Sequence, residues 1–508
     1  MSVLRKRIVN FRFFPVLFFC VCIGSVIASL VFDKPFYDYY VLGLGVAIGV
    51  VVAIATRGKA VLVLVCIFAL LFSYVLCSGQ IDGARRAEQN LSSEIVTVRV
   101  EYVENDVVCV SVKDGLDGVE GLCEFDTENV YDYPLDIGNE LTLGGVRVSK
   151  LNVENQDGSL NTYYFNSRTR YTLEAEELID FSDGGQNIVE AVRNGLISAT
   201  ENLPDDIRGI TIALLTGDKY AVSDEVYNSY KVSGIAHVLA VSGMHVGFLV
   251  VFLEWLLRRF KLRRIVRVFI LIPVMLFLCA LCDFTPSVVR SSIMVGVHLL
   301  IPVLTNRRYD MLSGMSLAGV IIVLSNPMSV YSYGFLLSYG SVFGIVLFGR
   351  TFERLCSRLP SLFAQTVSVS LATTVGVFPM SVYMFGEFSM LSVLTNALVL
   401  PILSVGYGIL VGLAGLAVIF PPFSFVIAGG SWLVYYLNFV TQIIASVDIA
   451  SVTMSAPLWF CLAYYLFVIL LSDFVNLKRT TKRLILIAFI VVGCAYFSFF
   501  CNFSYLSA

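Results

Sequence analysis

The sequence predicts a polytopic α-helical membrane protein of about 13 spans, with a small β-barrel domain inserted outside the membrane. Of its 508 residues, 57% are hydrophobic and 14% are charged, whereas globular chains carry about 25% charged residues. The apolar residues form continuous runs near the ~20 residues that a helix needs to cross hydrocarbon. Because these runs do not alternate with polar residues, a membrane-spanning β-barrel is excluded.

Residues 1–77 predict three membrane spans. Apolar runs lie at about 13–32, 41–56 and 60–77, and no clear small-residue cleavage site follows the first, which indicates a retained signal anchor. Basic residues mark the cytoplasmic ends of spans. The basic cluster between residues 5 and 12 therefore places the N-terminus in the cytoplasm and the following polar segment outside a bacterial-type inner membrane.

Residues 78–183 predict a small acidic β domain. Residues 78–190 hold 23 acidic and 8 basic residues, a net charge of −15, and the rest of the chain carries +12. From about Glu94 the hydrophobic pattern has a period of two, which predicts a strand. About five short strands between turn signals fit a small barrel, and the OB-fold is the leading candidate. Its acidity argues against DNA binding, because phosphate contacts need a basic groove.

Two of the 12 cysteines, Cys109 and Cys123, fall in predicted strands of this domain. A Gly-containing connection separates them, so they could face each other across a hairpin. Because a location outside the cytoplasm permits disulfides, they are a candidate disulfide pair. The other ten cysteines lie in or beside apolar runs and are interpreted as packing residues.

Residues 184–233 predict amphipathic helices that lie along the membrane surface. Ile207, Ile210 and Leu214 form one apolar stripe, and Asp205 and Arg208 lie on the other side. The spacing of three and four residues predicts that this stripe is the buried face.

Residues 234–508 predict a membrane domain of about ten spans. The apolar runs lie at about 234–257, 265–282, 288–304, 311–325, 329–349, 361–385, 391–420, 423–447, 456–472 and 484–500. The basic clusters between them fall at alternate connections, so all are cytoplasmic and the C-terminus lies outside.

Two stretches of this domain look broken. One contains Asp283, Pro286 and Arg290, and the other is the long run 391–420 with Asn396 and Pro401. Irregular backbone at membrane depth survives only against protein or in a water-filled cavity. A re-entrant segment and a Pro-kinked helix both remain open for these stretches.

The residues most suggestive of function lie between 234 and 247. His237 and His245 fall on one helical stripe, and imidazoles inside a membrane usually face a cavity or polar partners. Two histidines without a carboxylate between them do not make a zinc site. Ser242 lacks the sequence context of a nucleophile elbow. A polar lining for a conduction path is therefore preferred.

Other residues are expected to join this lining. Arg290 could contact a phosphate or pair with a carboxylate, and Asp218 and Asp310 are candidate companions placed by the fold. Glycines allow close approach of a second helix. We therefore expect helix packing at three positions, which are Gly234, Gly243 and Gly247.

The run 234–247 resembles the signature of the ComEC family of competence proteins, the inner-membrane DNA-uptake channels of natural transformation. Further segments agree with that family in content and order, and they are 215–218, 286–290, Asn326-Pro327, 334–339 and 385–389, followed by Asn396 and Pro401. The resemblance covers roughly residues 205–405. Two features differ from the family. Leu336 stands where a glutamine is common, and no histidine follows His298, so we expect the metallo-β-lactamase-like nuclease domain of many members to be absent.

The resemblance implies a channel that passes one strand of DNA into the cytoplasm. The implied path residues are His237, Ser242, His245, Arg290, Asp218, Asp310 and Asn396. The implied partners are single-stranded DNA, membrane lipid, a DNA receptor, a separate nuclease and a cytoplasmic motor ATPase. We expect no cofactor, no metal and no enzymatic activity, because the chain shows no nuclease or nucleotide-binding motif.

Two other functions compete with the channel. A secondary transporter for a small anionic solute would also use Arg290, broken helices and midplane histidines. A membrane-embedded hydrolase would use Ser242 with a histidine, and it predicts covalent labelling of that serine by a serine-reactive probe.

Overall fold

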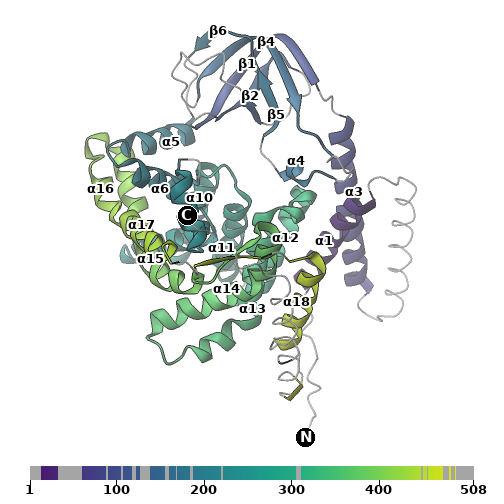
Figure 1. Cartoon of the computed structure of the whole chain (residues 1–508), viewed down its shortest axis with the longest axis vertical. Coiled ribbons are helices and arrows are strands. Elements are labelled where there is room, and N and C mark those ends of the chain that lie inside the picture. The colour runs from purple at the N-terminus through teal and green to yellow at the C-terminus, as the bar shows by residue number, and fades with distance from the viewer. Residues whose placement is uncertain are drawn as a thin grey trace. The chain divides into compact units, whose positions relative to one another are not determined.

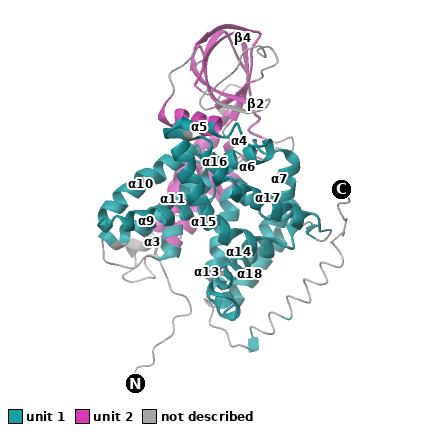
Figure 2. Cartoon of the chain, turned by 90° about the vertical axis from the view of Figure 1, so that its left-hand side faces the viewer, with its two compact units in different colours: residues 1–12, 199–315, 333–508 teal, residues 13–198, 316–332 magenta. Residues whose placement is uncertain are grey.

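The computed structural model describes most of the chain. The described residues are 13–31, 60–86, 90–104, 107–116, 122–125, 138–154, 160–166, 169–182, 187–218, 221–304, 310–447, 450–454, 456–472, 480–481 and 487. The predicted spans at 41–56 and 484–500 therefore lie outside the described residues, except for residue 487. The chain forms two compact units, coloured magenta and teal in Figure 2.

The magenta unit, unit 2, comprises residues 13–198 and 316–332. Its elements are α1 (Phe13–Val31), α3 (Ala60–Arg86), β1 (Asn90–Glu104), β2 (Val107–Asp114), β3 (Leu122–Phe125), β4 (Glu140–Lys150), α4 (Thr162–Asn166), β5 (Thr169–Glu174), β6 (Glu177–Ser182), α5 (Ile188–Ala199) and the 3₁₀ helix η1 (Pro327–Tyr331). The chain returns to unit 2 at residue 316, deep inside what the sequence predicts as the second membrane domain.

Five strands of unit 2 close into a barrel, drawn in Figure 1 as a curved sheet. The hydrogen-bonded order is β1-β2-β3-β5-β4, β4 pairs back to β1, and β3 and β5 are parallel. β6 extends the sheet along β4. The predicted alternation is confirmed in β1, where Val96 and Val98 are fully buried and Ile95 is exposed. Each buried valine contributes about 1.5–3 kcal/mol relative to an exposed one, so the pattern fixes the inward face.

Helices α1 and α3 of unit 2 pack closely against each other. Gly24 brings the backbone of α1 against the Leu70 carbonyl of α3, where a side chain would clash. Ser25 and Ser73 then share a buried hydrogen bond of 2.7 Å between their hydroxyl oxygens. Small residues and buried hydroxyls are the usual basis of helix association in membranes.

Unit 1, teal in Figure 2, comprises residues 1–12, 199–315 and 333–508. Its elements are α6 (Asp205–Thr216), α7 (Asp224–Val232), α8 (Ala236–Leu239), α9 (Gly243–Arg259), α10 (Arg264–Leu281), α11 (Pro286–Leu304), α13 (Tyr333–Leu355), α14 (Ser361–Phe385), β7 (Glu387–Ser389), α15 (Ser392–Ile419), the 3₁₀ helix η2 (Pro421–Phe423), α16 (Val426–Gly430), α17 (Trp432–Ala445), β8 (Ser451–Thr453) and α18 (Leu458–Leu471). Helix α12 (Met311–Ser325) begins in unit 1 and ends in unit 2.

Six helices in the described part are long and apolar enough to cross a membrane. They are α1, α3, α10, α13, α14 and α15, and four shorter apolar helices are α11, α12, α17 and α18. The protein is therefore a helical membrane protein, and the count of about 13 spans stays a prediction.

Two sequence predictions are corrected in unit 1, and one open alternative is decided. The run 234–257 is not one span, because extended backbone at Ala240 and Ser242 separates α8 from α9. Of the two possibilities left open for the run 391–420, the structure has the Pro-containing helix, since α15 is one helix of 28 residues that contains Pro401. The apolar stripe of α6 is buried as expected, but so are Thr211 and Ala213 on its other faces. Helix α6 is therefore a core helix rather than a one-sided surface helix.

Candidate functional site

The segment 234–247 forms a bend between two helices of unit 1. Gly234 has a φ of 81°, and a side chain on it would collide with Ser389 and Ser392, so only glycine fits there. After the short helix α8, extended residues turn the chain into α9. The two histidines are consequently not on one stripe, because His237 is exposed on α8 and His245 is fully buried in α9.

The buried His245 closes the first turn of α9. Its Nδ1 accepts a hydrogen bond of 3.1 Å from the backbone N–H of Ser242, and it lies 3.1 Å from the Ser242 hydroxyl. This is a capping box, which satisfies donors that a helix N-terminus otherwise leaves open. Because Nδ1 accepts, the proton of the neutral ring is on Nε2.

The other side of the imidazole faces α15. The rings of His245 and Tyr407 meet edge to face with their centroids 4.8 Å apart. The Nε2 of His245 and the hydroxyl of Tyr407 are both buried and have no hydrogen-bond partner among the described residues. Sequence reasoning missed Tyr407, although its position between Gly406 and Gly408 in an apolar span was an available signal of close packing.

The contact between Ser242 and His245 does not form a catalytic triad. A triad histidine takes the serine proton with one ring nitrogen and holds a carboxylate with the other. Here the nitrogen nearest the serine accepts a backbone N–H, and Nε2 meets no carboxylate in the described part of the chain. The described residues also contain no group of three or more His, Cys, Asp or Glu placed to hold a metal ion.

Helix α11 packs its first turns against the same bend. The Ser287 hydroxyl donates to the Val241 carbonyl at 3.1 Å, and a side chain on Gly243 would clash with Ser291. Gly243 therefore lies where a side chain would collide with α11. A side chain on Gly247, by contrast, would meet no described atom within 4 Å, so no packing role follows for it.

Arg290 lies on α11 and is 2% exposed. Its guanidinium lies 5.3 Å above the ring of Tyr339 in α13, a cation–π contact. Its Nη1 is buried without a hydrogen-bond partner, and the described residues offer it no carboxylate. A buried cation that lacks an anionic partner is costly, which makes Arg290 the strongest candidate in unit 1 for contacting an anion.

The remaining candidates have local roles or lie apart. Asp310 caps α12, where its carboxylate accepts from the backbone N–H of Ser313 at 3.0 Å. Asn396 donates to the Ser370 hydroxyl at 3.1 Å and so joins α15 to α14. Asp218 is half-buried at the end of α6, beside Gly217, whose φ of 85° reverses the chain.

The expected disulfide of the barrel is not formed. In the β2–β3 hairpin, Cys109 lies opposite Glu124 and Cys123 lies opposite Val110. Residues that face each other across strands share a side of the sheet, so the two thiols lie on opposite sides. Cys123 is buried inside the barrel and Cys109 is partly exposed, and no bond joins them.

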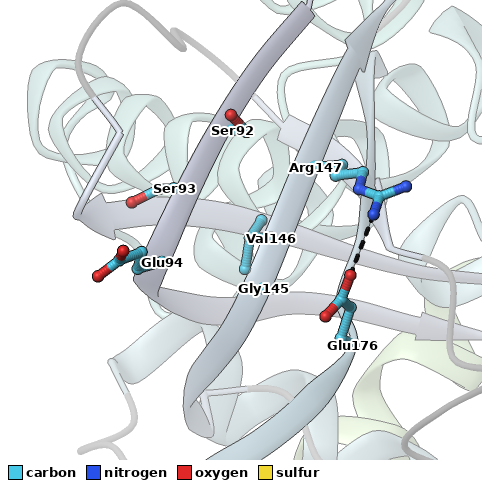
Figure 3. A pocket seen from close by; sticks show the side chains of 7 residues that line it. All are labelled: Ser92, Ser93, Glu94, Gly145, Val146, Arg147 and Glu176. Carbon is cyan, nitrogen blue, oxygen red and sulfur yellow. Dashed lines mark hydrogen bonds and ion pairs between the residues drawn. The ribbon is translucent and has the colours of Figure 1, made fainter.

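A shallow pocket on the outside of the barrel was not predicted. Figure 3 shows its lining, which is Ser92, Ser93, Glu94, Gly145, Val146, Arg147 and Glu176. Arg147 and Glu176 form an ion pair of 3.1 Å across it, with both side chains largely exposed. Exposed ion pairs contribute about 0–1 kcal/mol to the stability of a fold. The residues that line this pocket do not indicate a catalytic or binding function.

The fold and the buried polar groups define the class of the molecule as a helical membrane protein with a small β-barrel domain. The pattern of the family described as Competence protein matches residues 214–476, just over half of the chain. The chain therefore belongs to the competence protein family. The match begins within α6 and covers the bend, α11 and α13 to α15.

Three relatives are similar to part of this chain. ComE operon protein 3 of Bacillus subtilis (strain 168) is 31% identical over 301 residues, 58% of this chain and 38% of that protein. An uncharacterized protein of Aquifex aeolicus (strain VF5) is 31% identical over 206 residues, 40% of this chain and 46% of its own. The uncharacterized protein YcaI of Escherichia coli (strain K12) is 22% identical over 270 residues, 50% of this chain and 36% of its own.

This chain thus spans less than half the length of the relatives it matches. No solved structure matches it significantly.

Proposed function

We propose that this protein is a channel of a bacterial inner membrane that passes single-stranded DNA into the cytoplasm during natural transformation. Membership of the competence protein family supports a role in DNA uptake. The transport helices are those of unit 1, since the family match falls mainly on them.

The observation that carries the proposal is the environment of Arg290. A DNA path through a membrane needs cations that are not already paired with carboxylates. Arg290 is such a cation, since its side chain is enclosed by aromatic and helical surfaces rather than paired with an acid. Because Arg290 is buried, phosphate cannot reach it in the described conformation, which in this proposal corresponds to a closed path.

The barrel is proposed to be an OB-type domain that does not itself bind the strand. The closed order β1-β2-β3-β5-β4 with parallel β3 and β5 supports the OB assignment. The net charge of −15 over residues 78–190 would repel phosphates, so the DNA path avoids the barrel. In this proposal a DNA receptor, a separate nuclease and a cytoplasmic motor ATPase are partner proteins, and this chain performs no catalysis.

A secondary transporter for a small anionic solute is the second candidate. The enclosure of Arg290, which is 2% exposed, favours it, because one buried guanidinium forms a binding site of small-anion size. The two candidates differ in the size of the transported molecule, which is a DNA strand for the channel and a small anion for the transporter. Measuring the uptake of DNA directly distinguishes them.

The test is uptake of labelled DNA into a DNase-protected cytosolic pool, in a transformable host deleted for this gene. We expect deletion to abolish protected uptake while DNA binding at the cell surface persists. Arg290→Gln keeps a polar side chain but removes the charge, so we expect uptake to fall about tenfold, the equivalent of one charge-assisted hydrogen bond. Arg258→Gln, which changes an exposed arginine paired with Glu254, is the matched control and should stay within about twofold.

Unchanged uptake in the deletion strain would refute the channel, and uptake of small anions would then be measured in the same strains. Loss of uptake in the deletion strain with normal uptake in Arg290→Gln would keep the channel and remove Arg290 from its path.

A further inference from the structure

Two cationic side chains of unit 2 lie together at one end of the barrel. β4 ends at Lys150, and the next backbone N–H, that of Leu151, donates to the carbonyl of Arg170 in β5 at 3.0 Å. Both side chains approach the same aromatic ring. The Nζ of Lys150 lies 5.4 Å and the Cζ of Arg170 lies 5.6 Å from the ring centroid of Tyr164 in α4. Cations at such distances from a tyrosine ring make cation–π contacts.

This end of the barrel lies against the last turns of α3, which belongs to the same unit. Tyr164 is 3% exposed and shares a buried cluster with Ile81 of α3. Asn326, also in unit 2, joins the two elements. It accepts a hydrogen bond from Nε2 of Gln80 in α3 and donates one to the carbonyl of Phe165 in α4, both at 3.2 Å.

Helix α3 relates these cations to the membrane surface. Its apolar stretch, Val65–Arg85, is long enough to cross a membrane and ends beside the barrel. The Nζ of Lys150 donates to the carbonyl of Ala84, one of the last four carbonyls of α3, which have no partner within the helix. Tyrosine, lysine and arginine side chains gather where a span leaves the hydrocarbon, at the depth of the lipid head groups. We therefore expect Arg170 and Tyr164 at that depth, on the barrel side of the membrane.

Arg170 differs from the paired cations of the same segment. Arg85, Arg99, Lys113 and Arg147 each form an ion pair with a glutamate. Arg170 is half-buried and forms no ion pair with any residue that the structure describes, although residues 78–190 hold 23 acidic residues and only 8 basic ones. A guanidinium left without a carboxylate among so many acids is free to bind an anion from outside the chain.

We propose that Arg170, held over the ring of Tyr164, binds the phosphate of an anionic phospholipid in the leaflet on the barrel side, with Lys150 as a second positive charge. A guanidinium matches a phosphate because its parallel N–H groups reach two oxygens at once. The contact also offsets the repulsion between an anionic membrane surface and a segment of net charge −15. The site thus holds the acidic barrel at the membrane, and it does not depend on which molecule the protein transports.

A lipid phosphate fits this place better than a phosphate of DNA. A DNA strand carries many phosphates, and the acidic barrel segment repels each of them. A lipid presents a single phosphate, and the membrane supplies it at the depth where α3 ends.

The test is photo-cross-linking in nanodiscs of phosphatidylcholine that contain the full-length protein and a limiting fraction of phosphatidylglycerol with a photoreactive head group. Mass spectrometry of chymotryptic peptides that cover residues 160–174 measures the yield. We expect Arg170→Gln to lower that yield about tenfold, the equivalent of one charge-assisted hydrogen bond. Arg147→Gln is the matched control, because it removes the same charge from the same barrel at an exposed ion pair with Glu176, and it should stay within about twofold.

The buried Cys123 reports folding of the barrel and should resist maleimide in every variant. If Arg170→Gln exposes it, Arg170→Lys is compared with Arg147→Lys instead. We expect a roughly threefold lower yield for Arg170→Lys, since lysine keeps the charge but loses the paired donors.

A yield in folded Arg170→Gln equal to that of the control, or equal yields for the two lysine variants, would overturn the proposal. Displacement of the lipid by a single-stranded oligonucleotide would assign the site to DNA, and displacement by inorganic phosphate would assign it to the free anion. Both results would also overturn the lipid site. None of these outcomes bears on the channel, which the deletion strain tests separately.

Discussion

At the scale of single residues, the two buried nitrogen-bearing side chains His245 and Arg290 have different roles. An unpaired buried donor costs about 1–3 kcal/mol, which must be offset elsewhere. For His245 the offset is local, since Nδ1 and Ser242 together cap α9 at the bend. Arg290 caps no helix in the described part of the chain. Its guanidinium lies over the face of the Tyr339 ring, and its Nη1 has no hydrogen-bond partner there. We therefore interpret His245 as a structural residue, whereas Arg290 stays a proposed residue of the path.

This difference predicts the behaviour of two matched histidine substitutions. His245→Phe removes the cap of α9, and loss of an N-cap costs about 1 kcal/mol. In a chain of 508 residues, 1 kcal/mol corresponds to a change in melting temperature of only about 1 °C, so we expect the melting temperature in detergent to fall by roughly 1–2 °C. His298→Phe changes an exposed histidine on α11 and should shift the melting temperature by less than about 0.5 °C. Equal shifts for both variants would show that the capping box is not what holds His245 in place.

At the scale of elements, the barrel hairpin predicts the reactivity of its cysteines. Burial raises the pKa of Cys123 to about 12, so almost no thiolate is present at pH 8, and its side chain is fully buried. We expect iodoacetamide at pH 8 to alkylate Cys123 only after denaturation. Cys109 in the same hairpin is partly exposed and should react faster in the native protein. The intact mass should be the same with and without reductant, and two hydrogens gained on reduction would instead reveal the disulfide.

Elements were predictable where the signal is local. The sequence predicts about five short strands from alternation, and five strands, β1 to β5, close the barrel. β6 was missed because its sequence lacks strict alternation of polar and apolar residues, and none of its six side chains is buried, as expected of a strand at a sheet edge. The break before α9 was missed too, although a serine ahead of an apolar run is a recognised helix start.

The candidate site was predictable only in part, because its contacts are distant in sequence. The sequence identified Arg290 and His245 as unusual residues in apolar surroundings. It could not pair Arg290 with Tyr339 or His245 with Tyr407, since each pair joins different helices. Nor could it show that Asn326 is hydrogen-bonded to Gln80 and Phe165. These residues are far apart in sequence, and they come together because the chain leaves unit 2 after residue 198 and returns to it at residue 316.

At the scale of the whole molecule, the distribution of charge predicts the orientation in the membrane. The acidic barrel segment carries −15, whereas the connections at 258–267 and 350–358 are rich in arginine. Basic connections tend to stay in the cytoplasm, so we expect the barrel to lie on the other side of the membrane.

Two exposed serines allow this orientation to be tested. Ser182 ends β6 on the barrel, and Ser357 follows α13 within an arginine-rich connection. In intact spheroplasts we expect a membrane-impermeant maleimide to label Ser182→Cys, while Ser357→Cys is labelled only after permeabilisation, with the site located by mass spectrometry. Both substitutions replace one small exposed side chain by another, so neither should alter the fold. Labelling of both from outside would place the arginine-rich connection on the same face as the barrel. The charge argument would then be wrong, and with it the direction in which we propose that DNA passes.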